Sequence, residues 1–299
     1  MVSRQLVVPE PSAKDIIIEH GTWYEKTSIR RFNGKVLGYV TPWNGLGYDV
    51  AKIFAPKFTH ISPVWLQIKR KSDLKYVITG THDIDSNWLK DVRKNNSNIK
   101  INVRVLFDGW TVQDYTSLFI EKKEQIALSN TLVEQCKNSK FDGVVLEVLA
   151  QIGGSLRSDI LLNFVKLVAK TLSDAGLELI LVIPPVRGIK QEMFTQEHFN
   201  ELSEAVTAFS LMTYDFSNPQ RPGPNSPINW IKLCVESLVP DPNDKRREKI
   251  LLGLNFYGND YTVSGGGPIL GHDFIKLLKS YKGKLKLDES SEENFFEVR

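Results

Sequence analysis

The chain has 299 residues, of which 41% are hydrophobic and 24% charged, and these proportions exclude a disordered, collagen-like or coiled-coil protein. Its formal net charge is +3, and the densest basic run, residues 245–249, precedes an apolar segment, so we expect no nucleic-acid interface. No run of 18 apolar residues occurs, so we expect no membrane span.

Strand-like and helix-like segments alternate along most of the chain. Residues 1–34 are mixed and polar, and we expect them to form an arm on the domain. Seven segments rich in Val, Ile and Leu then follow, at residues 36–43, 58–66, 100–107, 141–149, 177–185, 206–214 and 250–257. Nearly continuous apolar runs of this length predict strands that are buried on both faces.

Helical patterns separate these strands, for example at residues 122–139 and 158–176. The average spacing of roughly 36 residues between strand starts fits a (β/α)8 barrel, the TIM-type α/β fold. A doubly wound open sheet is the alternative. That fold would carry a phosphate-binding GxGxxG loop after its first strand, whereas residues 41–49 read TPWNGLGYD. We therefore predict a barrel over residues 35–257.

Residues 258–299 depart from the alternation. The run Gly265–Gly267, followed by Pro268, predicts a loop, and residues 272–283 predict a short helix. Residues 284–289 alternate in polarity, which is typical of an exposed strand rather than of an eighth barrel strand.

Other polar and sulfur-containing residues give weaker signals. Cys136 and Cys234 lie in helical patterns and are predicted to be buried free thiols. The five histidines show no metal-ligand spacing, and residues 82–85 predict a loop with a helix cap, so we expect no metal and no cofactor. Asn95 begins a glycosylation sequon.

Aromatic side chains gather at the predicted carboxyl ends of the strands, where barrel enzymes place their active sites. Three of the six tryptophans, Trp43, Trp65 and Trp110, fall at such ends. Aromatic rings stack on the apolar faces of sugars, so these positions favour a carbohydrate cleft over simple caps on the barrel interior.

The chain resembles a known protein family. The resemblance rests on four segments, in this order along the chain: VLGYVTPWN, ISPVWLQ, FSLMTYDFS and ILLGLNFYG. Over about residues 30–299 the chain resembles glycoside hydrolase family 18, the chitinases and chitinase-like barrels. It is most similar to the chitinase domain-containing, or stabilin-interacting chitinase-like, group. The resemblance implies a cleft for chitin-type oligosaccharides. The expected carbohydrate-binding residues are Tyr39, Trp43, Trp65, Trp110, Glu147, Met212, Tyr214, Asp215 and Tyr257.

The fourth predicted strand bears on catalysis. The family pattern is Asp-Gly-x-Asp-x-Asp-x-Glu; here Asp142 is retained, whereas Val145, Glu147 and Leu149 replace the last three acidic residues. The resemblance implies a retaining mechanism in which the final Glu protonates the leaving oxygen. Leucine has no proton to donate, and general acid catalysis contributes about 10²–10⁴-fold. We therefore expect no catalytic residue and no hydrolase activity.

Two alternatives stay open. A weakly active glycosidase would use Glu147 and Asp215, although Glu147 lies two residues, about 6.6 Å, deeper along the strand than the lost acid. A general acid must approach to about 2.6–3.2 Å. The other alternative is a non-catalytic protein-interaction scaffold with a vestigial cleft.

The resemblance also implies a secreted or lysosomal setting, lipopolysaccharide binding and a scavenger-type receptor partner, although residues 1–15 do not read as a signal peptide. In the family, an insertion precedes the eighth strand, and residues 284–299 resemble the first half of that insertion. We expect a fragment or short isoform whose barrel is open between strands seven and one. Such an opening exposes a parallel strand edge, which favours aggregation.

Overall fold

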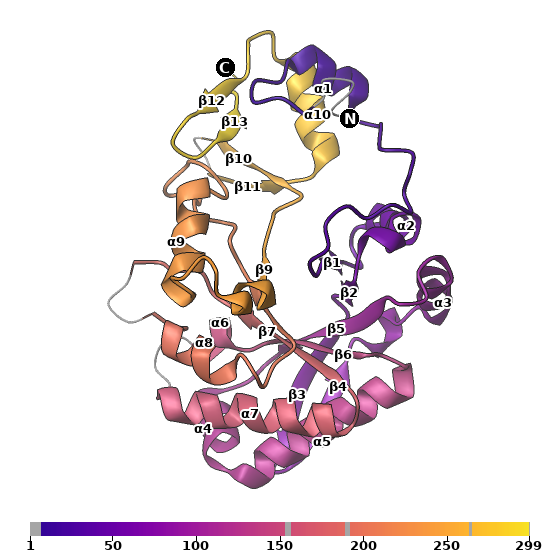
Figure 1. The fold of residues 1–299 in the computed structure, drawn as a ribbon, viewed down its shortest axis with the longest axis vertical. Coiled ribbons are helices and arrows are strands. Elements are labelled where there is room, and N and C mark those ends of the chain that lie inside the picture. Colours follow the sequence, from indigo (N-terminus) through magenta and orange to yellow (C-terminus); the bar gives the residue numbers. More distant parts are fainter. Residues whose placement is uncertain (1–6, 153–156, 189–191, 263–264, 299) are drawn as a thin grey trace. The chain divides into compact units, whose positions relative to one another are not determined.

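The computed structural model describes residues 7–152, 157–188, 192–262 and 265–298 (Figure 1). The chain forms two compact units. The first, called here the barrel unit, comprises residues 27–211 and 237–251. The second, called the C-terminal unit, comprises residues 1–26, 212–236 and 252–299.

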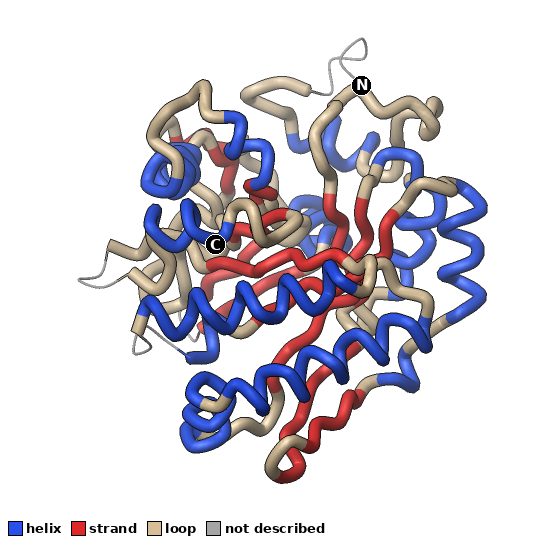
Figure 2. Tube along the Cα trace, turned by 60° about the horizontal axis from the view of Figure 1, so that its bottom comes forward, coloured by secondary structure: helices blue, strands red, loops and turns tan. Residues whose placement is uncertain are grey.

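A curled sheet forms the centre of the barrel unit (Figure 2). Its main path runs through β1 (Leu37–Val40), β2 (His60–Pro63), β5 (Lys100–Phe107), β6 (Gly143–Glu147), β7 (Glu178–Ile183), β8 (Ala208–Leu211) and β9 (Ile250–Leu252). Consecutive strands on the path from β1 to β8 pair in parallel. Since β1 and β9 are its end strands, the structure confirms a TIM-type sheet that is open between the first and seventh predicted strands.

Helices on the outside of this sheet bury its apolar side chains. They are α2 (Gly45–Ile53), α3 (Ser86–Asn95), α4 (Val112–Ile120), α5 (Lys122–Ser139), α6 (Leu149–Ile152), α7 (Ser158–Asp174) and α8 (Gln196–Leu202). The long helices α5 and α7 pack on each other and on β6 and β7. Leu128, Leu132 and Phe164 from these helices are completely buried, which accounts for the apolar stripes in the sequence.

Several local predictions are confirmed. Asp85 caps α3 by accepting from the backbone N–H of Asn87 and Trp88. Cys136 and Cys234 are buried free thiols, and burial raises the pKa of Cys136 to about 12.

A β-hairpin within the barrel unit was not expected from the sequence. Its strands β3 (Leu66–Ser72) and β4 (Lys75–Thr79) are antiparallel, and β3 also pairs in parallel with β5. Arg70 on β3 forms ion pairs with Asp114 of α4 and Glu124 of α5. The hairpin is rich in exposed lysine and therefore lacks the apolar pattern that predicts buried strands.

Polar side chains meet inside the amino-terminal end of the curled sheet. Glu178 Oε2 lies 3.2 Å from His60 Nε2 and accepts from Asn102 Nδ2 at 3.0 Å. Burial by itself would raise the pKa of Glu178, but these two hydrogen bonds and the nearby cations lower it overall. Glu178 is therefore held as a carboxylate within the sheet.

Short elements make up the C-terminal unit: α1 (Ala13–Glu19), most of α9 (Ile228–Leu238), β10 (Gly258–Thr262), β11 (Gly265–Ile269), α10 (Gly271–Ser280), β12 (Lys286–Asp288) and β13 (Glu293–Phe295). The segment expected to be an arm forms α1, which packs on α10. β12 pairs with β13 rather than with the barrel sheet.

The prediction of a loop at Gly265–Gly267 was wrong, because these glycines form β11, antiparallel to β10. Gly266 has φ +137°, and a Cβ there would lie 2.1 Å from the carbonyl oxygen of Asp260. Glycine thus permits a close backbone approach that any side chain would prevent, which composition alone does not reveal.

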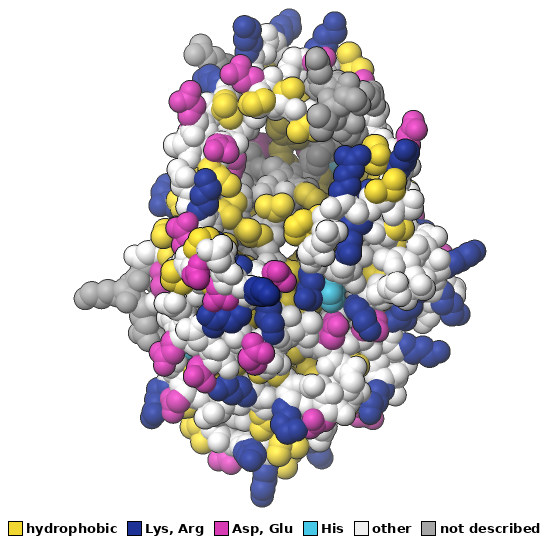
Figure 3. All heavy atoms as spheres, in the orientation of Figure 1, with side chains coloured by type: hydrophobic (Ala, Val, Ile, Leu, Met, Phe, Trp, Pro, Cys, Tyr) yellow, Lys and Arg dark blue, Asp and Glu magenta, His cyan; other side chains and the backbone are white. Residues whose placement is uncertain are grey.

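Across the described ranges, no helix is both long and apolar enough to span a bilayer. On the face in view, basic and acidic side chains are interspersed (Figure 3).

Candidate functional site

The expected carbohydrate-binding residues fall into two sets, one in each unit. Tyr39, Trp43, Trp65, Trp110 and Glu147 belong to the barrel unit, and Met212, Tyr214, Asp215 and Tyr257 belong to the C-terminal unit. Each set is described below within its own unit.

Trp43 and Tyr39 present aromatic surface near the end of β1. The Trp43 side chain, just before α2, is 75% exposed, and Tyr39 is 43% exposed. The Tyr39 hydroxyl lies 2.8 Å from Ser210 Oγ on β8, which fixes the orientation of the ring. Both rings are accessible to a ligand.

Trp65 corrects the sequence expectation, because its side chain is completely buried. Its indole N–H donates to the Tyr48 hydroxyl at 2.6 Å, and its ring packs against Trp88 and Phe141. The residue follows β2 but faces the helices, so it is a core residue of the barrel unit and not a binding residue.

Trp110 is half-buried at the end of β5. Its ring stacks on Tyr76 from the unexpected hairpin, with centroids 5.8 Å apart, and its N–H donates to the carbonyl oxygen of Ile68 at 2.8 Å. The hairpin therefore holds this ring in place and leaves only part of it to solvent.

Charged residues of the fourth-strand motif are held by basic partners. Asp142 accepts from the backbone N–H of Ile101 and from Arg93, which links the starts of β5 and β6. Glu147 Oε2 accepts from Arg104 Nε at 2.9 Å, and Arg104 Nη2 lies 2.8 Å away. Arg104 was missed by sequence reasoning, although a lone arginine in the apolar segment KINVRVLF is a visible signal.

The motif residues Val145 and Leu149 are both buried, Leu149 with 1% exposure. The expectation that Glu147 and Leu149 lie two residues apart along the same strand was wrong. β6 ends at Glu147, and Leu149 begins the short helix α6. The run Leu-Ala-Gln-Ile favours helix and buries its first side chain.

Asp215 is the best-defined polar group of the C-terminal set. It is exposed and accepts from the Tyr257 hydroxyl at 2.7 Å. The rings of Tyr257 and Tyr214 meet edge to face at 6.5 Å. Burial, followed by the Asp215 carboxylate, raises the pKa of Tyr257 and keeps its hydroxyl protonated. Met212, which precedes Tyr214 and Asp215 in the sequence, is half-buried.

The conformation of Asp215 is supported by residues that sequence reasoning missed. Asp215 has φ +56°, in the left-handed region, and its N–H donates to Asn225 Oδ1 at 2.8 Å. Asn225 N–H donates in turn to Glu293 Oε2 at 2.9 Å. Strained backbone that is held by such contacts is common at binding sites.

No group of three or more His, Cys, Asp and Glu within residues 7–152, 157–188, 192–262 and 265–298 is placed to hold a metal ion. Asn95, the sequon residue, is exposed and donates to the carbonyl oxygen of Lys52.

A model of Glycosyl hydrolases family 18 matches residues 35–296. An endochitinase from Manduca sexta is 23% identical over 266 residues, covering 79% of this chain and 47% of the endochitinase. The chain thus spans about half the length of that curated relative.

Solved structures agree in fold. A chitinase from Chromobacterium violaceum superposes with a TM-score of 0.71 at 20% identity, covering 86% of this chain and 80% of that one. A chitinase from Cycas revoluta, solved with (GlcNAc)3, has a TM-score of 0.66 at 13% identity, covering 85% and 82%. These likenesses show a shared fold. Because the family model matches most of the chain, the protein belongs to Glycosyl hydrolases family 18.

Proposed function

We propose that the protein is a catalytically inactive chitinase-like lectin that binds chitin-type oligosaccharides. The observation that carries this proposal is the contrast between the lost acid and the retained binding groups. By the resemblance we place Leu149 at the position of the catalytic acid, whereas Trp43 is exposed and Asp215 accepts from the Tyr257 hydroxyl.

The lack of activity is argued from proton transfer. Leucine cannot protonate a leaving group. Glu147 accepts from the Arg104 guanidinium, which supports a role for this carboxylate as an ion-pair partner within the sheet. We also take Glu147, the last residue of β6, to stand two positions before the family's acid, which the resemblance aligns with Leu149.

Sugar binding is argued from the exposed groups of each unit. Trp43 offers an open ring face, which suits the apolar face of a pyranose. Asp215 offers a carboxylate acceptor beside the Tyr214 and Tyr257 rings, which suits a hydroxyl or an acetamide N–H. The Cycas revoluta relative, which was solved with (GlcNAc)3, supports the ligand class.

The finer assignment follows the resemblance. We assign the chain to the chitinase domain-containing group, in a secreted or lysosomal setting, with Asn95 glycosylated. Lipopolysaccharide and a scavenger-type receptor are further proposed partners.

The decisive experiment is calorimetry with chitin tetramer beside a hydrolysis assay with a chromogenic chitobioside. We expect measurable heat, no turnover, and loss of binding in Trp43→Ala. The matched control is Trp23→Ala, which removes another exposed indole and should leave binding unchanged. Turnover that disappears in Glu147→Gln would replace the lectin with a weak glycosidase. Absence of heat would favour a protein-interaction scaffold.

A further inference from the structure

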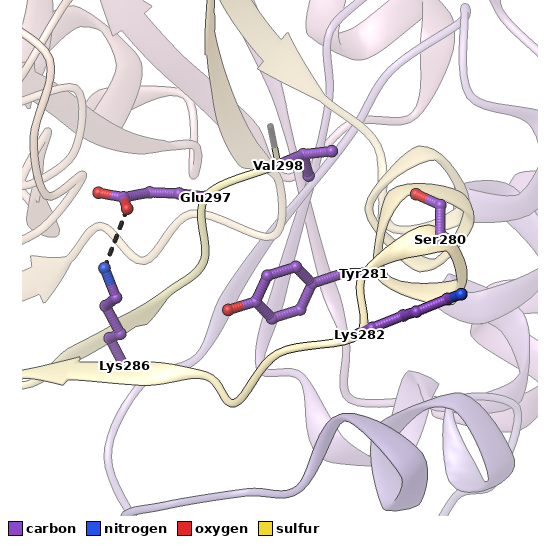
Figure 4. Close-up of a pocket in the computed structure, with 6 residues that line it drawn as sticks. All are labelled: Ser280, Tyr281, Lys282, Lys286, Glu297 and Val298. Atoms are coloured by element: carbon purple, nitrogen blue, oxygen red, sulfur yellow. Dashed lines mark hydrogen bonds and ion pairs between the residues drawn. The ribbon is translucent and has the colours of Figure 1, made fainter.

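The C-terminal unit contains a cavity whose lining residues include none of the expected carbohydrate-binding residues. It has a volume of about 460 Å³ and lies between the end of α10 and the segments around β12 and the carboxyl end (Figure 4). Its lining residues are Ser280, Tyr281, Lys282, Lys286, Glu297 and Val298.

Positive charge is concentrated in this part of the chain. Five lysines occur between positions 276 and 286, at 276, 279, 282, 284 and 286. Lys282 and Lys286 line the cavity and are exposed. Among the described residues, Lys282 has no ion pair. An anion in the cavity would therefore meet one ammonium group that no carboxylate neutralises.

Lys286 is already engaged by the one acidic residue of the lining. Its Nζ lies 2.9 Å from Glu297 Oε2, and both side chains are more than half exposed. An exposed pair of this kind contributes little free energy, so an incoming anion can replace the Glu297 carboxylate at Lys286.

An aromatic ring completes the lining. Figure 4 shows the Tyr281 ring reaching from the end of α10 toward the Lys286–Glu297 pair. Its hydroxyl donates to the carbonyl oxygen of Lys284 at 2.9 Å, and the ring packs on Phe296 at 4.9 Å between centroids. The ring is thus held near the Lys286–Glu297 pair, while the Lys282 side chain extends to the opposite side of Tyr281.

We propose that this cavity binds an acidic saccharide unit, one that carries a sulfate ester or a carboxylate, within a polysaccharide. Lys282 and Lys286, whose side chains lie on opposite sides of Tyr281, each take an anionic group of the polymer, and the fixed Tyr281 ring takes the apolar face of the sugar between them. This site goes beyond the proposed chitin binding and does not depend on it, because none of its lining residues belongs to the expected chitin-binding set.

The test uses the full chain and three polysaccharide probes: dextran sulfate, polygalacturonate and neutral dextran. We expect binding of at least one anionic probe, weakening as salt rises, and no binding of neutral dextran. A preference for dextran sulfate identifies a sulfate ester, and a preference for polygalacturonate identifies a carboxylate. The proposal is overturned if neither anionic probe binds. It is also overturned if a single-stranded oligonucleotide binds as tightly as the better of the two anionic probes.

Charge variants locate the site. Lys282→Gln and Lys286→Gln should each weaken binding about two- to fivefold, the range expected for an exposed ion pair. Glu297→Gln should strengthen it, because Lys286 is then released. Lys137→Gln, an exposed lysine on α5, makes the same charge change elsewhere and should have no effect. Equal losses in all three lysine variants, or no gain in Glu297→Gln, would show that net charge alone attracts the probe.

Discussion

Arg104 on β5 and Glu147 on β6 form an ion pair, with Arg104 Nε and Nη2 at 2.9 and 2.8 Å from Glu147 Oε2. The pair connects the neighbouring strands β5 and β6 at the last residue of β6. Both side chains are largely buried, with 17% and 22% exposure.

Arg104→Gln should lower the free energy of unfolding by about 1–3 kcal/mol, because it leaves a mostly buried carboxylate without its cation. Urea denaturation measures the change. Arg157→Gln is the matched control, since its ion pair with Asp159 is exposed and should contribute about 0–1 kcal/mol. Equal effects in the two variants would show that the Arg104–Glu147 pair has no special role.

Two tryptophans should behave in opposite ways. Trp65→Ala should destabilise the chain by about 3–5 kcal/mol, because it empties a packed site in the core. Trp43→Ala should change stability by less than about 0.5 kcal/mol, because its ring is exposed. Denaturation and calorimetry on the same samples separate the two roles. A chitin-binding defect in a folded Trp65→Ala variant would contradict the core assignment.

Tyr257→Phe should weaken chitin-oligomer binding about three- to tenfold, since one hydrogen bond that orients Asp215 contributes about 1 kcal/mol. Tyr281→Phe removes a hydroxyl elsewhere in the same unit and serves as the control. Titration calorimetry measures both variants, and equal affinities would remove Tyr257 from the site.

Acid should destabilise the barrel unit through carboxylates with lowered pKa values. Glu124 is buried and Glu178 is half-buried, which opposes ionisation, but hydrogen bonds from Arg70 and His60 respectively lower both pKa values overall. For Asp114, the Thr111 N–H is the main cause of the lowered pKa. Such groups stabilise the fold above their unfolded pKa values, about 4.3 for Glu and 3.9 for Asp. This stabilisation is lost as pH falls through the lower folded values.

Glu178→Gln should therefore flatten the loss of stability below about pH 5, where the unfolded carboxyl begins to take up protons. Urea midpoints measured between neutral and acidic pH give the slope. Glu134→Gln, an exposed change on α5, should leave the slope as in the unchanged chain. A Glu178→Gln variant with an unaltered acid slope would refute this role for Glu178.

Much of the barrel could be predicted because its signals are local. The segment 100–107 is β5, and residues 122–139 are α5, as their apolar patterns indicate. The β3–β4 hairpin escaped prediction because its side chains are mostly polar, and β11 escaped because its glycines pair through the backbone.

The sequence by itself determined most of the strand positions and the family motifs, since each depends on residue identity within one short segment. Only the tertiary structure decided that Trp65 is core and that Arg104 holds Glu147. It also decided that Glu293 supports Asn225, 68 residues away. Burial and ion pairing depend on which distant segments the fold brings together, and no local pattern records that.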